Sequence, residues 1–480
     1  MDVNGDLVIS GDGTEGGYGI LNTSDPAFQV NLLGNSGFGV WSNSEDLYDA
    51  GTGAAPVVTG DDAALVAGGS LVTNGGFDSA TTGWAAGGGT IASVAGGETG
   101  NCVALTYVSG PSQYTYSDVS LTTGKLYELS IWIKSGTSGD ETCQFGIGTS
   151  GSSWVYYDTT TSSASWVQNT IVFEATSTTS RIMIQKSSAT AGTMLFDTIT
   201  LNEVTPGIVS GTAGPDSWGK DATHHIFREH SGTNTQNGSF YALKSDPQSQ
   251  YDYVAYPSYA TSILSSFYTK FVGRTITFGI WIKSSTESDI RYSISDGVAA
   301  NTYSSYHTGG GDWEWLEATK TCSASTVSFR ISIGHDSASP GTAYISQPML
   351  VFGSSIGEGN YVAPVGEWVN CDGELALLSQ TSISANFDMN VEAYTNGKVP
   401  KGALAVKLSF NGQAGTVGSA FQVYPTGQSA LYGINTCGFT TADYTRVSGD
   451  SALSSDGEIT IARTNTWTNN TMNIRAVQVS

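Results

Sequence analysis

The sequence predicts an all-β protein: tandem antiparallel jelly-roll β-sandwiches, then a C-terminal β-sandwich domain, with an extended N-terminal arm in front. Three observations support this fold class. Aromatic residues make up 11% of the chain and Gly occupies 60 of 480 positions, whereas charged residues are only 13%, a composition typical of many short strands joined by turns. Apolar and polar residues alternate in short segments. The segment IWIKS occurs twice, at 131–135 and 280–284.

The arm covers residues 1–65. VNGDLVIS (3–10) and NLLGNSGFGVW (31–41) have the composition of isolated strands, and residues 48–70 form a linker rich in Gly, Ala and Asp. Isolated strands leave unpaired backbone groups at their edges. We therefore expect the arm to be held by contact with another protein chain.

The two sandwiches are predicted at residues 66–204 and 205–354, because the sequence of the first is partly repeated in the second. Trp132 and Trp281 are 149 positions apart (281 − 132), and the same offset relates Trp166 to Trp315 and Arg181 to Arg330. Nearer the start of each copy the offset is 138 (242 − 104), so the second copy has a longer connection near 257–268. A period this long indicates duplication of a whole domain, since solenoid repeats span only about 20–50 residues. We expect these three residue pairs to superpose.

Within each copy, alternation of apolar residues predicts strands with one face on a core. Tyr127, Leu129, Ile131 and Ile133 share one face in the first copy. Residues 355–480 form the predicted C-terminal β-domain, in which 404, 406, 408 and 410 are apolar.

Two groups of segments resemble known families. LVTNGGFDSATTGW (71–84), LFDTITLNEV (195–204) and the IWIK strand resemble the jelly-roll carbohydrate-binding modules attached to xylanases and cellulases, and the resemblance covers roughly 66–354. NLLGNSGFGVW repeats the opening segment at an offset of 39 (74 − 35). Together with YVAPVGEWV (361–369) and GKVPKGALAV (397–406), it resembles bacteriophage tail-fibre and appendage proteins.

These resemblances imply a non-enzymatic virion structural protein, a tail fibre or a head or tail appendage, that contacts host-surface polysaccharide. They imply a homotrimer whose N-terminal arm binds other virion proteins. The start MDVNGDLVIS lacks a secretory signal, so we expect synthesis in the bacterial host cytoplasm and a location in the virion. The alternatives are a secreted carbohydrate-binding protein and a polysaccharide depolymerase.

The resemblance also implies a structural calcium ion in the first sandwich. Modules of this type bind it through an acid just after the opening segment and another on the last strand, which match Asp78 and Asp197. In the second copy the late position is Ser346 (197 + 149), so the pattern is absent there. The alternative is that both Asp residues cap turns.

Glycan contact is predicted at aromatic residues that occur in both copies. Trp154 and Tyr157 correspond at the 149 offset to Tyr303 and Tyr306, and a three-residue spacing in a strand places the members of each pair on opposite faces. Trp132 and Trp281 lie on the face opposite the Ile residues. Aromatic rings offer a flat apolar surface to a sugar. The alternative is that these rings seal a sheet face or a subunit interface.

Charge and motifs exclude several classes. The net charge of −23 (19 − 42) repels phosphate and anionic lipid, so we expect neither nucleic acid nor membrane as a partner. Five widely spaced Cys residues are expected to be buried thiols. Common hydrolase, zinc-protease and nucleotide motifs are missing, which favours a protein that is not an enzyme.

Two other segments carry candidate polar side chains. His224, His225 and His230 in HHIFREH are expected in an exposed loop rather than around a metal. Asp61, Asp62, Asp216 and Asp221 could supply glycosidase carboxylates only at a separation that the sequence does not reveal.

Overall fold

The structure is a computed structural model with a nearly all-β fold, as predicted. It divides into two compact units, one of residues 46–205 and one of residues 1–45 with 206–480. No helix in the part of the chain that the structure describes is long and apolar enough to cross a membrane. The structure describes residues 7–9, 19–21, 30–44, 63–65, 70–110, 113–123, 125–149, 153–186, 190–230, 232–363, 366–395, 397–429, 434–437 and 444–479.

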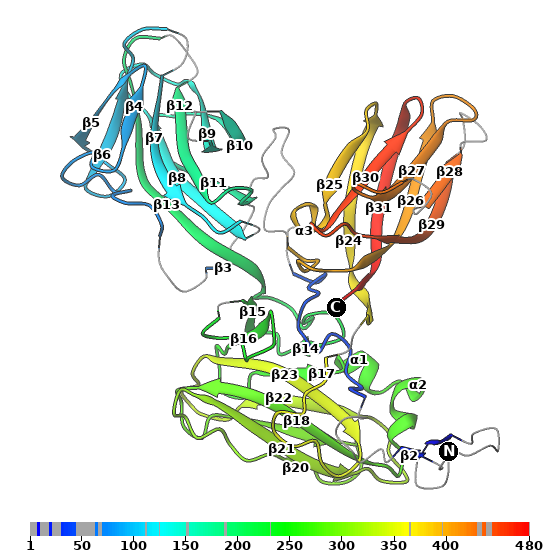
Figure 1. Ribbon diagram of the computed structural model, residues 1–480. Coiled ribbons are helices and arrows are strands. Elements are labelled where there is room, and N and C mark those ends of the chain that lie inside the picture. Colours follow the sequence, from blue (N-terminus) through cyan, green and yellow to red (C-terminus); the bar gives the residue numbers. More distant parts are fainter. Residues whose placement is uncertain are drawn as a thin grey trace. The chain divides into compact units, whose positions relative to one another are not determined.

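The first jelly roll fills the unit of residues 46–205 (Figure 1). One antiparallel sheet has the order β10-β9-β12-β7-β4, and the other has the order β11-β8-β13-β6-β5. Buried side chains from both sheets, such as Ile131, Phe145 and Phe196, form the core between them. The strands are β4 (Ala85–Gly87), β5 (Thr90–Ala95), β6 (Asn101–Thr106), β7 (Gln113–Ser120), β8 (Leu126–Ser135), β9 (Thr142–Gly148), β10 (Trp154–Thr161), β11 (Val167–Glu174), β12 (Thr179–Lys186) and β13 (Thr193–Ile208).

The second jelly roll repeats this topology strand for strand. Its sheets have the orders β20-β19-β22-β17-β14 and β21-β18-β23-β16-β15. Short helices, α1 (Tyr259–Ser262), α2 (Ser265–Tyr268) and a 3-10 turn (Thr269–Phe271), occupy the longer connection that the sequence predicts. The strands are β14 (Gly219–Lys220), β15 (His225–Glu229), β16 (Ala242–Asp246), β17 (Tyr253–Tyr256), β18 (Thr275–Ser284), β19 (Ile290–Ser295), β20 (Thr302–Tyr303), β21 (Trp313–Thr321), β22 (Arg330–His335) and β23 (Ala343–Phe352).

Strand register supports the duplication and corrects one residue pair. Trp132 lies opposite Asp197, and Trp281 lies opposite Ser346, in agreement with the 149 offset. In β21, however, Trp315 lies opposite Trp281, whereas in β11 the residue opposite Trp132 is Gln168. The counterpart of Trp315 is therefore Gln168 rather than Trp166. Compared with the first copy, the second copy is two residues shorter between β18 and β19 and two residues longer between β21 and β22. These two changes cancel, so an alignment without gaps hides the shift.

Each jelly roll has an opening segment, and the two opening segments follow the same backbone path. Leu71 donates its N–H to the carbonyl of Leu201 at 2.8 Å, and Leu32 donates to Leu350 at 2.8 Å, with 350 = 201 + 149. Left-handed φ angles occur at Asn74 and Phe77 (58° and 53°) and again 39 positions earlier, at Asn35 and Phe38 (both 51°). Residues 31–44 are therefore the opening segment of the second jelly roll.

The Trp that follows this segment shows where the second jelly roll is interrupted. Trp84 Nε1 donates to the Thr73 carbonyl at 3.2 Å, and Trp218 Nε1 donates to the Gly34 carbonyl at 3.2 Å. In both copies this Trp packs against the Phe of the opening segment. The ring centroids of Phe77 and Trp84 are 5.3 Å apart in the first copy, and those of Phe38 and Trp218 are 5.1 Å apart in the second. Phe and Trp are 7 positions apart in the first opener (84 − 77) and 180 apart in the second (218 − 38). The first jelly roll is thus inserted into the opening loop of the second.

This arrangement corrects the predicted N-terminal arm. NLLGNSGFGVW belongs to the opening segment of the second jelly roll and packs within its own chain. Its residues Leu33, Phe38 and Trp41 lie in the core of that jelly roll. The boundary expected at residue 65 does not separate an arm from the sandwiches. The other expected strand, in VNGDLVIS, is observed as β1 (Leu7–Ile9), which pairs with β2 (Gly19–Leu21). A further short strand, β3, is Ala63–Leu65. Residues 22–29, 45–62 and 66–69 lie outside the described residues.

The C-terminal domain consists of two antiparallel sheets, with orders β24-β31-β26-β29 and β25-β30-β27-β28. Its core includes Val406, Leu408 and Phe410, as the alternation predicts, together with Val40 from the opening segment. Leu404 is exposed instead. The elements are β24 (Trp368–Ile383), β25 (Phe387–Asn390), α3 (Val391–Tyr394), β26 (Ala405–Ala414), β27 (Ala420–Pro425), β28 (Ile434–Cys437), β29 (Thr445–Ala452), β30 (Glu458–Arg463) and β31 (Trp467–Gln478).

Asp216 connects the three parts of its unit. Its carboxylate accepts the N–H of Ser42 at 2.7 Å, the hydroxyl of Ser42, and the N–H of Asp372 at 2.6 Å. Burial raises the pKa of Asp216. This residue therefore joins the opening segment, the second jelly roll and the C-terminal domain, and it is not an exposed glycosidase carboxylate.

The HHIFREH segment is not an exposed loop, because residues 225–229 form β15. His224 is fully buried and shares the Ser245 hydroxyl with His335, each at 2.8 Å. His335 Nδ1 in turn lies 2.8 Å from Asp289. Cys102, Cys143 and Cys322 are buried free thiols, as expected, while Cys371 is half-buried.

A matched pair of substitutions tests the interrupted second jelly roll. Phe38→Ala should lower the unfolding free energy of the unit that contains residues 206–480 by about 3–5 kcal/mol, because a buried ring is replaced by a cavity. Phe77→Ala, at the corresponding position, should destabilise only the unit of residues 46–205. Calorimetry of the full chain can assign each loss to a transition. A Phe38→Ala chain in which the transition of the larger unit is unchanged would contradict the insertion.

Candidate carbohydrate-binding face

The candidate site is the outer face of the sheet β10-β9-β12-β7-β4 in the first jelly roll. In β7, Gln113, Thr115 and Ser117 are buried, whereas Tyr114 and Tyr116 point outward and are half-buried. The two rings lie 5.8 Å apart. Strand alternation therefore places a pair of tyrosines on the face opposite the core.

A second aromatic pair lies on the same face because β10 contains a bulge. Trp154 lies opposite Gly148 and Tyr157 opposite Gly146, with a register shift between Trp154 and Tyr156. The extra residue turns the three-residue spacing into one that places both rings on one side, 5.4 Å apart. The expectation that Trp154 and Tyr157 lie on opposite faces is therefore wrong. Tyr156 is the ring that packs against the core.

The glycines of β9 keep the surface between these aromatic pairs low. A Cβ at Gly148 would lie 2.3 Å from Met183 Sδ, and one at Gly146 would lie 2.2 Å from the Tyr156 carbonyl oxygen. Met183 is buried between β9 and β7 and faces outward in β12. The row from β10 to β7 is thus Tyr157, Gly146, Met183 and Tyr116, an apolar strip with aromatic rings at both ends.

Polar side chains lie beside the strip. Gln185 Nε2 donates to Gln144 Oε1 at 3.3 Å. Arg181 lies 3.8 Å above the Tyr116 ring and donates from Nε to Asp118 Oδ1 at 2.7 Å. This hydrogen bond lowers the pKa of Asp118. The Arg and Asp charges offset each other.

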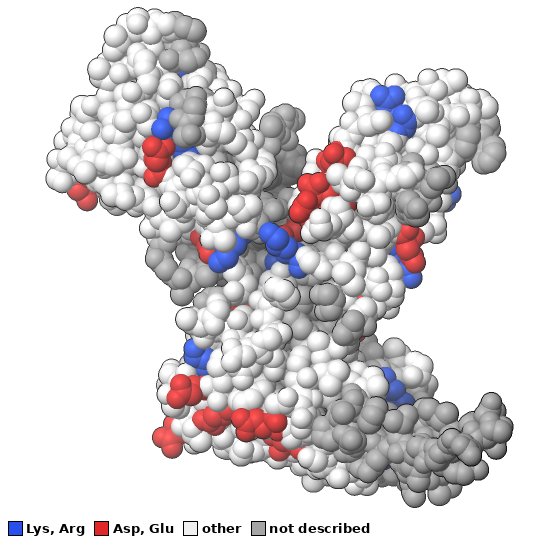
Figure 2. Space-filling view, viewed as in Figure 1, with Lys and Arg blue, Asp and Glu red and all other residues white. Residues whose placement is uncertain are grey.

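This arrangement suits an uncharged, hydroxyl-rich ligand. The rings and Met183 offer apolar surface to the C–H face of a sugar, and the two amides can donate to and accept from hydroxyls. In the view of Figure 2, most of the described surface carries neither basic nor acidic side chains. The strands of the sheet are about 4.8 Å apart, so the face spans roughly 19 Å from β10 to β4.

The second jelly roll fills the corresponding face differently. Tyr303 lies opposite Ser293 in β19, which makes it the counterpart of Tyr157 and not of Trp154. The Arg291 guanidinium is stacked between Tyr303 and Tyr306, 4.2 and 4.3 Å from their ring centres. Asp336 accepts from Arg291 at 2.8 Å and from the Tyr306 hydroxyl at 2.6 Å, and the latter bond raises the pKa of Tyr306. These rings already hold a partner from their own domain.

Trp132 and Trp281 lie on the other sheet of each jelly roll, in β8 and β18. Both are half-buried on the outer face and cannot share a site with the β10 and β20 aromatics. Trp281 packs 5.8 Å from Trp315, whose indole N–H donates to Glu317 at 3.0 Å. Glu317 also accepts the N–H groups of Ile356 and Gly357. The Trp281 side of the second jelly roll thus carries the connection to the C-terminal domain.

The predicted calcium ligands are brought to one loop, residues 96–100. Asp197 is fully buried and accepts the N–H of Thr99 at 3.1 Å and of Thr198 at 2.7 Å. Burial raises the pKa of Asp197. Asp78 lies at the end of the loop, where a Cβ at Gly100 would be 2.1 Å from Asp78 Oδ1. No group of three His, Cys, Asp or Glu side chains suited to a metal occurs among the described residues, so carbonyl oxygens of the loop would have to complete the site.

The comparisons with known proteins concern the first jelly roll. Residues 69–190 match the family model of a carbohydrate binding domain. No curated protein matches the chain.

Solved structures that match parts of this chain include carbohydrate-binding modules. The tandem CBM22-1-CBM22-2 domain of Paenibacillus barcinonensis Xyn10C is 16% identical, with a TM-score of 0.25, and the match covers 60% of this chain and all of that one. The CBM22-1 xylan-binding domain of the same protein is 19% identical, with a TM-score of 0.25, over 29% of this chain and 97% of that one. A domain of tailspike protein 4 of bacteriophage CBA120 is 13% identical, with a TM-score of 0.23, over 28% of this chain and 21% of that one.

Several residues of the face were not predicted from the sequence. Tyr114 and Tyr116 could have been found from the alternation in QYTYSD (113–118), which places both Tyr side chains on the polar side of a strand. Gln144 and Gln185 carry no such signal, because their meeting depends on the pairing of β9 with β12.

The calcium expectation stays a prediction that calorimetry can test. Calcium in excess of its dissociation constant by about 100-fold should stabilise the unit of residues 46–205 by about 2.7 kcal/mol. Asp197→Ser introduces the residue found at the matching position of the second copy and should abolish this gain. The transition of the other unit is the internal control. Equal melting of the unsubstituted chain in calcium and in a chelator would contradict the prediction.

Proposed function

We propose that the first jelly roll binds a neutral polysaccharide along the outer face of β10-β9-β12-β7-β4. The observation that carries the proposal is that two pairs of aromatic rings lie on one face. These pairs are Trp154 with Tyr157 and Tyr114 with Tyr116, and a glycine-lined strip separates them. The match of residues 69–190 to a carbohydrate binding domain supports it. An open face that crosses several strands suits the middle of a glycan chain.

A neutral ligand is favoured by charge. The cation on the face is already bonded to Asp118, and the chain has a net charge of −23, which repels acidic glycans. The second jelly roll is the weaker candidate for the same role, because Arg291 and Asp336 already engage Tyr303 and Tyr306.

The wider role is a proposal of its own that rests on resemblance. In it the chain is a virion tail-fibre or appendage protein, homotrimeric and without enzymatic activity, whose glycan-binding domain contacts the host surface. The alternatives, a secreted carbohydrate-binding protein and a depolymerase, share the same binding face. The structure changes one part of this proposal: residues 31–44 are engaged within the chain, so an attachment segment must lie elsewhere.

Paired substitutions test the binding face. The double variant Trp154→Ala, Tyr157→Ala should bind neutral polysaccharides about tenfold more weakly or worse, since it loses two stacking rings. Tyr303→Ala, the register counterpart of Tyr157 in the second jelly roll, should leave binding unchanged. Affinity electrophoresis against a panel of neutral and acidic polysaccharides measures both, with melting temperature as the folding control. Undiminished binding by the folded double variant would refute the assignment.

A further inference from the structure

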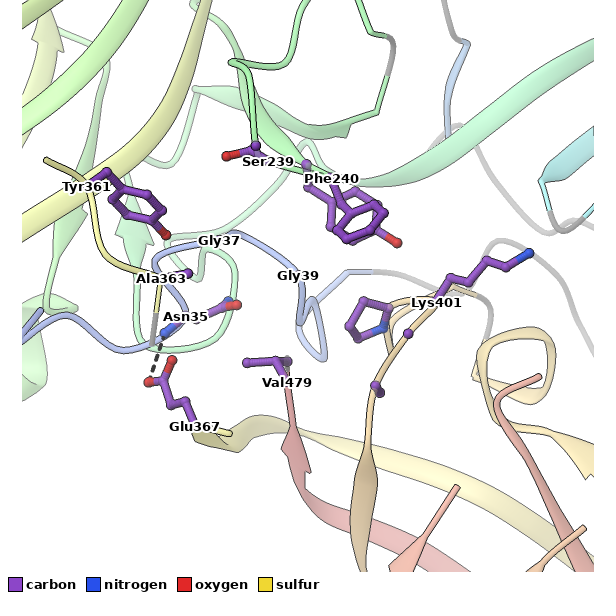
Figure 3. A pocket seen from close by; sticks show the side chains of 15 residues that line it. Asn35, Gly37, Gly39, Ser239, Phe240, Tyr361, Ala363, Glu367, Lys401 and Val479 are labelled. Atoms are coloured by element: carbon purple, nitrogen blue, oxygen red, sulfur yellow. Dashed lines mark hydrogen bonds between the residues drawn. The ribbon is translucent and has the colours of Figure 1, made fainter. Parts of the chain in front are cut away.

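A pocket in the unit of residues 1–45 and 206–480 is not used by the proposed glycan site. Figure 3 shows it between the opening segment, the loop before β16 and the start and end of the C-terminal domain. Its volume is about 100 Å³. Its lining residues include Gly37, Phe240, Tyr241, Tyr361, Glu367 and Lys401.

Glu367 supplies the charge of the pocket. Its Oε1 accepts the N–H of Asn35 at 3.2 Å, shown by the dashed line in Figure 3. Its Oε2 is shielded from solvent and has no hydrogen-bond partner in the part of the chain that the structure describes. Burial raises the pKa of Glu367 to about 7. A buried carboxylate oxygen without a donor is costly, which disfavours the ionised form of Glu367 unless a positive charge lies near it.

No described ion pair neutralises this carboxylate. Lys401 lines the pocket, but its side chain extends away from the middle of it (Figure 3). Arg228 is buried nearby, where it donates to the carbonyls of Gly39 and Gly397 and lies 3.8 Å from Glu392. Glu367 therefore has no basic partner among the described side chains.

Three aromatic residues, at 240, 241 and 361, also line the pocket. Tyr361 is fixed by a 3.2 Å hydrogen bond between its hydroxyl and that of Ser36. The Arg228 guanidinium covers the ring of Tyr241 at 4.5 Å, and Phe240 beside it is 82% exposed, unusual for so large an apolar side chain. Aromatic faces attract ammonium groups through their quadrupole. Rings and a carboxylate together form a site for a cation with an apolar body.

Gly37 leaves the space open. A Cβ added there would meet no atom within 4 Å, and the φ angle of Gly37 is not in the left-handed region. A larger residue at position 37 can therefore enter the pocket without backbone strain, which provides a clean way to fill it.

We propose that this pocket binds an organic ammonium group, with Glu367 as its counter-ion and Phe240 and Tyr361 against its apolar part. The ammonium group can belong to an alkylamine side chain or to an amino sugar. Both would place the nitrogen at Glu367, and they differ in the size of the group held by the rings.

Calorimetric titration of the full chain with n-butylammonium and with glucosamine tests the proposal, with 1-butanol and glucose as neutral partners of similar size. The ammonium probes should bind, and the neutral probes should bind about tenfold more weakly or not at all. Binding of n-butylammonium should strengthen as the pH rises through about 7, because Glu367 must be ionised while the amine stays protonated. The tighter of the two probes identifies the source.

Three variants make the outcome decisive. Glu367→Gln and Gly37→Leu should each weaken ammonium binding about tenfold or more, and Phe240→Ala should weaken it with little effect on folding because the ring is exposed. Glu358→Gln, which removes one exposed acid on the same connection, is the matched control and should bind normally. Equal binding of neutral and ammonium probes, or full binding by the folded Gly37→Leu or Phe240→Ala chain, would overturn the proposal. The glycan assay on the first jelly roll is unaffected by any of these results.

Discussion

The opening segment is the constraint on which this architecture depends. In both jelly rolls an Asn in the left-handed conformation donates from its amide to two carbonyls, those of Ala80 and Thr82 for Asn74 and those of Val40 and Asp216 for Asn35. Asn tolerates this backbone conformation better than most residues. The turn brings a Phe into the core beside a Trp. In the second jelly roll the two carbonyls come from chain segments 176 positions apart (216 − 40), so the domain closes only when its two pieces meet.

That closure also attaches the C-terminal domain. The same segment contributes Leu33, Phe38 and Trp41 to one core and Val40 to the next. Asp216, buried beneath it, binds Ser42 on one side and Asp372 on the other. A single stretch of about 14 residues (31–44) thus joins two domains into one unit, and the inserted first jelly roll remains a unit with its own core.

Sequence reasoning predicted the all-β class, the duplication and the longer connection before β18, because each depends on local alternation or on matched spacing. It also detected the 39-residue echo between the two opening segments but assigned the earlier one to an arm. Chain order suggests that a segment packs with its neighbours, and nothing in the local pattern of NLLGNSGFGVW shows that its partners begin at residue 206. The binding face was predicted in part. Trp154 and Tyr157 were identified, but a β-bulge reversed the expected direction of one ring, and Gln144 and Gln185 meet only through strand register.

The two copies differ where the glycan face is proposed. The first keeps two pairs of aromatic rings with a low strip between them, and the second fills the matching place with a stacked Arg291 held by Asp336. The most direct test is hydrogen exchange of the full chain with and without a neutral oligosaccharide that it binds. Our account predicts slower exchange at the amides of β7, β9, β10 and β12, and unchanged exchange in β17, β19, β20 and β22. Protection confined to the second jelly roll or the C-terminal domain would contradict it.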